Sequence, residues 1–162
     1  SGLLLANLPD PTTNVGGELL GTLRRAPWSL TATYSFVRSR ETEGDRRRDV
    51  PLTPRHSAGI VGMWERERTA RFGVEWYYTG VQRLEQNLYR DRSRPYMVVG
   101  LLAEWRLGPL RLFVNGENLT GVRQTRWDPL LRPSRAPDGR WTVDAWAPLE
   151  GRNVNGGIRV GF

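Results

Sequence analysis

The sequence predicts an all-β protein: an antiparallel up-and-down transmembrane β-barrel of about eight strands, with residues 1–162 forming one domain. Three observations lead to this prediction. Apolar side chains alternate with polar ones along most of the chain, which is the two-residue period of a strand with two different faces. Short and long connections alternate between these stretches, and large aromatic side chains gather near the ends of the apolar face. Together these features are typical of a barrel that crosses a lipid bilayer.

The alternation divides the chain into eight expected strands. It is clearest in residues 28–36, where every even position is apolar and every odd position carries a hydroxyl group. Several other segments alternate in the same way, some less cleanly, and the first segment is short. In chain order, we expect strands at about residues 2–7, 15–24, 28–36, 57–66, 71–78, 97–106, 110–120 and 154–162.

The connections between these strands are of two kinds. Three are tight turns, at residues 25–27, 66–68 and 107–109. The others are longer polar links, at about residues 8–14, 40–55, 81–95 and 121–152. Because the two kinds alternate strictly, all tight turns fall at one end of the sheet. This arrangement predicts short periplasmic turns and long extracellular loops.

Aromatic side chains indicate which face of the sheet meets lipid. On the apolar face, one group lies near the tight turns and another lies nearer the long loops. We expect these interface aromatics to be Trp28, Trp64 and Trp105 in the first group and Phe36, Trp76 and Tyr78 in the second. Two aromatic bands around an aliphatic middle suit the two headgroup regions of a bilayer. The alternative is a soluble ligand-binding barrel with its apolar face inward, but such a core would hold its large rings in the middle.

The opposite face carries charged side chains of both signs, and such groups are costly to place in hydrocarbon. We therefore expect them to form a charge network in the barrel lumen. Its predicted members are Glu18, Glu65, Arg71, Glu75, Glu104, Arg106, Arg111, Glu117 and Arg159. Glu75, Glu104, Arg106 and Arg111 in particular should pair across strands, because a charge that is removed from bulk water needs a partner.

Composition argues against several other functions. The net charge is +7, but the arginines are spread among acidic residues without a continuous basic stripe, so we expect no nucleic-acid partner. Cysteine is absent, which excludes disulfides and thiolate metal sites within the chain. His56 is the single histidine, and a structural role is favoured over metal binding. No catalytic triad or phosphate-binding glycine loop is present, so we expect neither an enzyme nor a bound cofactor.

The long link at residues 121–152 contains Trp127, Trp141 and Trp146. These rings either fold over the barrel mouth and contact ligand, or pack against neighbouring loops, which is the favoured alternative. Four acids of this link offer oxygen ligands for calcium, namely Asp128, Asp138, Asp144 and Glu150. Their spacing matches no EF-hand-like pattern, so a solvated loop is favoured. A glycosylation sequon at residues 118–120 is expected to lie inside a strand and is discounted.

Several motifs resemble the closing strands of TonB-dependent receptors. Tyr34-Ser35-Phe36, followed by a loop and residues 51–56 (Pro-Leu-Thr-Pro-Arg-His), is similar to a strand, an extracellular loop and the return into the next strand. Residues 77–80 (Tyr-Tyr-Thr-Gly) and 112–120 (Leu-Phe-Val-Asn-Gly-Glu-Asn-Leu-Thr) resemble late strands of that family, and residues 155–162 resemble its terminal strand. The resemblance extends from about residue 2 to residue 162.

This resemblance implies a location in the bacterial outer membrane, within a 22-stranded barrel that is plugged by another domain and driven by TonB. Outer-membrane lipid and lipopolysaccharide are the implied surroundings. The chain carries no plug, so TonB would act only through a plug domain absent here. The family imports iron-siderophores, cobalamin, other metal complexes and some sugars. Ile158, Val160 and Phe162 match the terminal signal that the barrel assembly machinery reads.

Two functional hypotheses follow. In the first, the chain is the C-terminal part of a receptor that imports a metal chelate of the siderophore type or a similar nutrient. In the second, the strand at 2–7 pairs with the strand at 153–162, and the chain closes into a self-contained eight-stranded barrel. Such a small barrel has room only for its own side chains, so its role would be structural, with no transport path.

Overall fold

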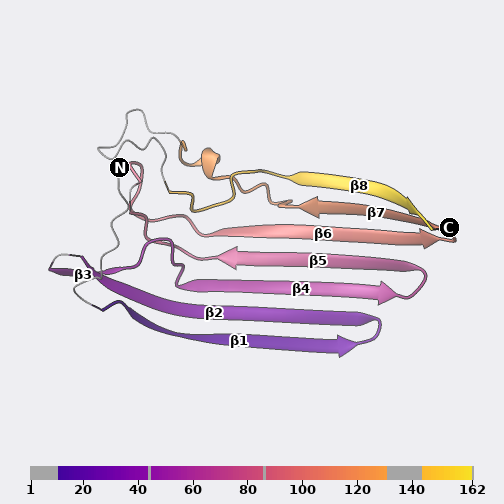
Figure 1. The fold of residues 1–162 in the computed structure, drawn as a ribbon, viewed down its shortest axis with the longest axis horizontal. Helices are drawn as coiled ribbons and strands as arrows, with labels where there is room; N and C mark the ends of the chain where they lie inside the picture. Colours follow the sequence, from indigo (N-terminus) through magenta and orange to yellow (C-terminus); the bar gives the residue numbers. More distant parts are fainter. Residues whose placement is uncertain (1–10, 44, 86, 131–143, 162) are drawn as a thin grey trace, which may run out of the picture.

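The computed structural model describes residues 11–43, 45–85, 87–130 and 144–161. Over these residues the protein is a single antiparallel sheet, with a short 3-10 helix, η1, beside it (Figure 1). The strands are β1 (Thr13–Arg25), β2 (Trp28–Glu43), β3 (Arg46–Asp49), β4 (His56–Arg66), β5 (Ala70–Thr79), β6 (Tyr96–Leu107), β7 (Leu110–Glu117) and β8 (Asn153–Val160), and η1 spans Gln124–Arg126. Among the described residues, no helix is long and apolar enough to cross a membrane.

The sheet has the order β1-β2-β4-β5-β6-β7-β8, so each long strand lies beside its nearest long neighbours in sequence. Figure 1 shows the tight turns together at one end of the sheet and the long connections together at the other. The predicted all-β, antiparallel up-and-down architecture is therefore confirmed. The seven long strands contain the centres of the seven segments predicted between residues 15 and 162.

The strand pairing aligns one residue from each of the seven long strands in a row of aliphatic residues and glycines on the apolar face. Leu23 pairs with Leu30, and the row continues without interruption to the last strand. Its further members are Gly62, Val74, Leu101, Gly116 and Val154. Register is therefore set by the alternation, because a shift of one residue would exchange the two faces of a strand. This apolar face stays open within the described structure: Leu23 is 65% exposed and Ile158 is 69% exposed.

Strand β3 was missed by the sequence prediction, which placed residues 40–55 in a loop. β2 continues past Phe36 to Glu43 and forms a hairpin with β3. Arg40 pairs with Asp49, and Glu41 pairs with Arg48. Both faces of this hairpin are polar, so it carries no apolar alternation for a sequence pattern to detect.

The end of β7 also differs from the prediction, which extended the strand to residue 120. The strand ends at Glu117 because Asn118 has a φ of +48°, in the left-handed region that no regular strand contains. Asparagine tolerates this conformation better than most side chains do.

Within the described residues, β1 pairs with β2 alone, and β8 pairs with β7 alone. The strand expected at 2–7, which would close the sheet, lies outside the described residues. The terminal Phe162 of the expected assembly signal also lies outside them. The other two residues of that signal, Ile158 and Val160, lie on the apolar face of β8 in pairs with Leu112 and Leu110.

Candidate functional site

At the end of the sheet opposite the tight turns, long connections pack against each other and form a small hydrophobic core. Leu84, Trp146 and Ala147 are buried there. Tyr96, Val122 and Trp127 are partly buried and pack around them. The link after β5 and the link after β7 therefore form one folded unit above the sheet, held together by contacts between residues about sixty positions apart in sequence.

Asp128 occupies the centre of this unit, and its side chain is completely buried. Arg90 donates from Nε to Asp128 Oδ1 at 2.8 Å, and a second guanidinium nitrogen lies 2.7 Å from the same oxygen. Asp128 Oδ2 accepts from Asn87 Nδ2 at 3.1 Å and from the indole Nε1 of Trp146 at 2.9 Å. A buried carboxylate is stable only with such partners, and here each oxygen has its own.

Gln124 provides hydrogen-bond partners for backbone groups of the same loop unit. Its side chain is fully buried, and Oε1 accepts from the amides of Trp146 at 2.8 Å and Ala147 at 3.3 Å. Its Nε2 donates to the carbonyl of Asp144 at 2.7 Å. The 3-10 helix η1 carries Gln124 and sets it one turn before Asp128, whose amide donates to the Gln124 carbonyl. These hydrogen bonds join residues 124–128 to residues 144–147, in addition to their apolar contacts.

The tryptophans of the long link take different places. Trp146 is 3% exposed and stacks on Trp127 at a centroid distance of 5.3 Å. Arg90 lies over the Trp146 ring at 5.6 Å from its centroid. These contacts are those of the packing alternative, since the Trp146 ring is covered by its neighbours. Trp141 lies outside the described residues.

Asn118 ties the start of the long link to its end. Its Nδ2 donates to the carbonyls of Val122, Glu150 and Gly151 at 2.8, 3.0 and 3.3 Å. Its Oδ1 accepts from the Val122 amide at 3.0 Å. Sequence analysis placed this residue inside an expected strand, as part of a family-like stretch and of a sequon. The left-handed backbone and the side-chain bonds show instead a residue that closes the neck of a loop.

Ion pairs and hydrogen bonds join the β2–β3 hairpin to the residues after β5. Arg83 lies 3.2 Å from Glu41 and also donates to the Asp49 carbonyl at 2.8 Å. Arg55 donates to both oxygens of Asp49 at 3.1 and 2.8 Å. The hairpin is therefore fixed to the other connections by charged side chains.

On the charged face of the sheet, Glu104 lies at the centre of a cluster of arginines. Its carboxylate lies 3.6 Å from Arg71, 3.7 Å from Arg106 and 3.5 Å from Arg111. The Glu104 side chain is only 10% exposed. Arg71 is its partner across β5 and β6, while Arg106 and Arg111 form the next cross-strand pair. The strand register thus delivers three guanidinium groups to one carboxylate.

The other predicted members of the charge network lie on the same face but in other surroundings. Arg159 pairs in register with Arg111, and Glu65 pairs in register with Arg71. Glu18 accepts from Ser35 at 3.4 Å, and Glu117 accepts from Asn115 at 2.9 Å. Glu75 lies opposite Gly100 and Val61, away from the arginines. The structure therefore brings Glu104, Arg106, Arg111 and Arg71 together and leaves Glu75 apart.

The predicted interface aromatics lie on the apolar face. Trp28 and Trp64 form a cross-strand pair, and the Trp64 ring lies 5.5 Å from that of Phe72. Phe72 in turn meets Trp105 edge-on at 5.3 Å. Phe72 lies in the strand expected at residues 71–78 but was not predicted among the interface aromatics. It completes the row because it sits opposite Trp64 in β5.

At the other end of the same face, Trp76 stacks on Tyr78 at 6.4 Å. Phe36 lies 5.2 Å from the ring of His56, whose Nδ1 is 2.7 Å from the hydroxyl of Tyr34. His56 thus packs within an aromatic group. In the described part of the chain, no cluster of acidic or histidine residues has the geometry of a metal site. Asp138, one of the calcium candidates, lies outside that part.

These features define the wall of an antiparallel β-barrel, with a folded unit of loops at one end and a charge cluster on one face. The chain belongs to the TonB dependent receptor-like β-barrel family, whose model matches residues 2–119. No curated protein matches the chain.

Among the solved structures of similar fold are two bacterial receptors. The ferric-catecholate import receptor Fiu from E. coli K12 is 14% identical with a TM-score of 0.64, and the match covers 91% of this chain and 21% of that one. The ferric enterobactin receptor PfeA from Pseudomonas aeruginosa, a G324V mutant, is 16% identical with a TM-score of 0.60, covering 91% and 22%. At these identities the likeness shows the fold alone. The chain spans about a fifth of the length of both receptors.

Proposed function

We propose that the chain forms the C-terminal strands of a bacterial outer-membrane receptor that imports a ferric siderophore or a similar metal chelate. The observation that carries this proposal is the seven-stranded wall, apolar on one face and charged on the other, whose fold is that of a ferric-catecholate import receptor. The family is one of transport receptors, which supports a transporter rather than an enzyme.

Under this proposal the apolar face meets lipid. The row from Leu23 to Val154 crosses every long strand, and aromatic side chains lie at both ends of that face. Aromatic rings are enriched at the two interfaces of a bilayer because they combine apolar bodies with polar edges. The charged face, including Glu104 and its three arginines, then lines the lumen.

The same orientation puts the tight turns in the periplasm and the loop unit outside the cell. A loop unit held by Asp128 and Gln124 would present its outer side chains to a ligand in a fixed arrangement, which lowers the entropic cost of binding. Coupling to TonB would require a plug domain, and assembly would use Ile158, Val160 and Phe162 as the terminal signal. The match offers no support for a self-contained eight-stranded barrel, because the related solved receptors are far longer.

The test uses the full-length protein in a bacterial host that lacks its own siderophore receptors. Uptake is measured with an iron-labelled ferric catecholate, an iron-labelled ferric hydroxamate and cobalt-labelled cobalamin, supplied in turn. We expect uptake of an iron chelate that stops when the host lacks TonB. Uptake that continues without TonB would contradict the receptor mechanism. Binding of cobalamin or a sugar in place of iron chelates would contradict the proposed substrate while leaving the receptor class intact.

A further inference from the structure

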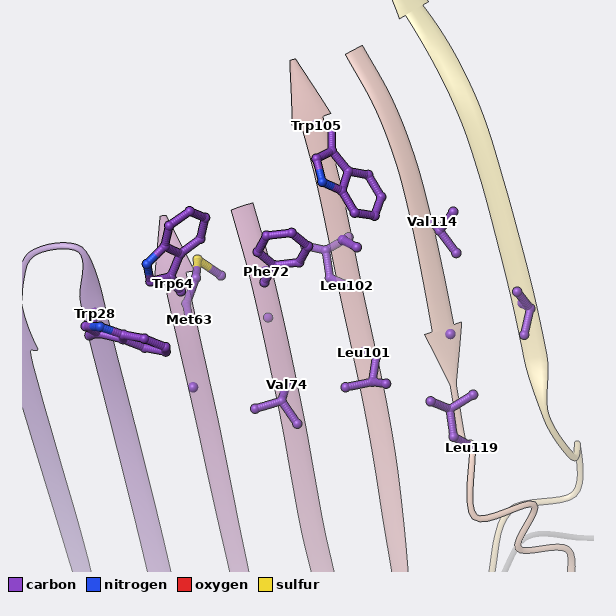
Figure 2. Close-up of a pocket in the computed structure, with 15 residues that line it drawn as sticks. Trp28, Met63, Trp64, Phe72, Val74, Leu101, Leu102, Trp105, Val114 and Leu119 are labelled. Carbon is purple, nitrogen blue, oxygen red and sulfur yellow. The ribbon is translucent and has the colours of Figure 1, made fainter. Parts of the chain in front are cut away.

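The apolar face is hollowed near the tight turns. The hollow has a volume of about 760 Å3. Figure 2 shows the rings of Trp64, Phe72 and Trp105 around its end nearer the tight turns, with Val74 and Leu101 toward the other end. The face is hollowed here because small residues, Gly62, Ala103 and Gly116, form the floor between these larger side chains.

Two arginines lie on the same face, beside the aromatic end of the hollow. Arg25 pairs in register with Trp28, which in turn pairs with Trp64, so the three residues form one row across β1, β2 and β4. Arg66 follows Trp64 by two residues on β4 and shares its face. Standard strand spacings put the two arginine Cα atoms roughly 12 Å apart, and two extended arginine side chains can meet across that distance.

Both guanidinium groups are available to a ligand. Arg25 and Arg66 are exposed, and neither makes an ion pair or a side-chain hydrogen bond within the described structure. The neighbouring arginines differ in position: Arg24 points to the charged face, where it pairs in register with Ser29. Arg68 lies in the turn with a φ of +64° and borders a separate hollow near Arg106 and Arg159.

We propose that this hollow binds an anionic phospholipid, with an acyl chain along the apolar floor and the phosphate between Arg25 and Arg66. The inference rests on the proposed function, because it takes the apolar face to be the lipid face. The hollow offers almost no polar groups of its own, so only an apolar chain fills it well. Two cations at one end of an apolar surface match a lipid with a negative headgroup, and guanidinium groups bind phosphate through paired hydrogen bonds.

The tryptophans of the hollow allow a direct test. Full-length protein is reconstituted into phosphatidylcholine bilayers that contain a minor fraction of phosphatidylglycerol with brominated acyl chains, which quench nearby tryptophan fluorescence. A parallel series contains brominated phosphatidylcholine in the same proportion. We expect stronger quenching by the anionic lipid. Replacing Arg25 and Arg66 by glutamine should lower the relative affinity for it roughly fivefold for each arginine removed.

Matched variants separate the site from general electrostatics. Arg24→Gln with Arg68→Gln removes the same charge from the same end of the sheet, and should leave most of the preference in place. Ala103→Phe fills the floor of the hollow and should reduce the preference while both arginines remain. Folding of each variant is checked by its heat-dependent migration on a gel.

The outcomes are distinguishable. Equal quenching by the two brominated lipids, or equal losses in the two arginine pairs, would overturn the lipid site and leave the membrane orientation standing. A variant in which Trp28, Trp64 and Trp105 are replaced by phenylalanine gives the quenching that comes from other tryptophans. If neither brominated lipid quenches the original protein more than this variant, the apolar face does not meet lipid. The orientation on which the site rests would then fail too.

Discussion

Arg90 and Asp128 form an ion pair at 2.7 Å in which the aspartate side chain is completely buried and the arginine side chain is 21% exposed. The pair joins two connections that lie on different sides of strands β6 and β7 in sequence. The two partners are therefore not equivalent: loss of the arginine leaves a buried charge, whereas loss of the acid leaves a cation that water can still reach.

This asymmetry gives the first prediction. Arg90→Met should destabilise the loop unit by about 3 kcal/mol, because the buried carboxylate loses its charge partner. Asp128→Asn should cost less, since a neutral amide needs no cation. Amide hydrogen exchange of residues 124–128 and 144–147 in the full-length protein measures the difference. The double variant should be more stable than the sum of the single losses predicts, and a strictly additive result would show that the pair is not coupled.

The Glu104 cluster gives the second prediction. Glu104→Gln removes the one carboxylate shared by Arg71, Arg106 and Arg111, and the three cations then repel one another. We expect the free energy of unfolding to fall by about 1–2 kcal/mol. The loss is limited because each arginine side chain is about a third exposed, so water screens part of the repulsion. Added salt should restore part of the stability. The control is Glu117→Gln, whose carboxylate accepts from Asn115 and has no arginine partner in the described structure. If both variants unfold at the same temperature, the cluster contributes nothing specific.

The third prediction concerns the two faces of the sheet. Single cysteines with a nitroxide label at Leu30, Ala32 and Val74 should be accessible to oxygen, which dissolves in the lipid core. Labels at Thr31 and Thr33 should instead be accessible to a water-soluble nickel complex. The chain contains no cysteine of its own, so each label in this segment has one site. Oxygen accessibility without a two-residue period along β2 would contradict the membrane orientation.

The fourth prediction concerns Gly157, which lies opposite Phe113 in the pairing of β7 and β8. A Cβ atom added at Gly157 would lie 2.8 Å from Cε1 of the Phe113 ring, closer than two carbons can approach. Gly157→Ala should therefore destabilise the sheet by about 1–3 kcal/mol, the range of overpacked positions. Urea unfolding of the full-length protein measures this loss.

Two further variants make that result specific. Phe113→Leu should relieve the effect of Gly157→Ala, because the smaller side chain leaves room for the methyl group. Gly17→Ala is the matched control, since a Cβ atom there would meet nothing within 4 Å. It should be neutral or slightly stabilising. A loss at Gly17 as large as the loss at Gly157 would show a general effect of glycine in strands and not a contact with Phe113.

Much of the wall follows from sequence alone because its causes are local. The alternation in residues 28–36 assigns each side chain to a face, and tight turns such as residues 25–27 force consecutive strands to be antiparallel neighbours. With one face apolar, register has few alternatives, and the row from Leu23 to Val154 is the result. Glu104 and its arginines were expected on one face for the same reason.

The hairpin of β2 and β3 and the end of β7 were not found in this way. Arg46–Asp49 has no apolar period, and its strand exists because charged side chains pair across it with β2. Asn118 looked like an ordinary strand residue. Its conformation is maintained by carbonyls at positions 122, 150 and 151, most of them distant in sequence.

The sequence by itself determined the class of fold, the two faces of the sheet and the end at which the turns gather, since each depends on a repeat of two residues or on a short turn. The tertiary structure alone decided which groups meet. Asp128 looked like a loop acid, and its burial beneath Arg90 and Trp146 depends on two loops folding together. Glu75 and Glu104 have the same alternation, yet Glu104 alone lies among arginines. The physical reason is that side-chain pairing depends on position across strands, and a linear pattern reports only the face of each residue.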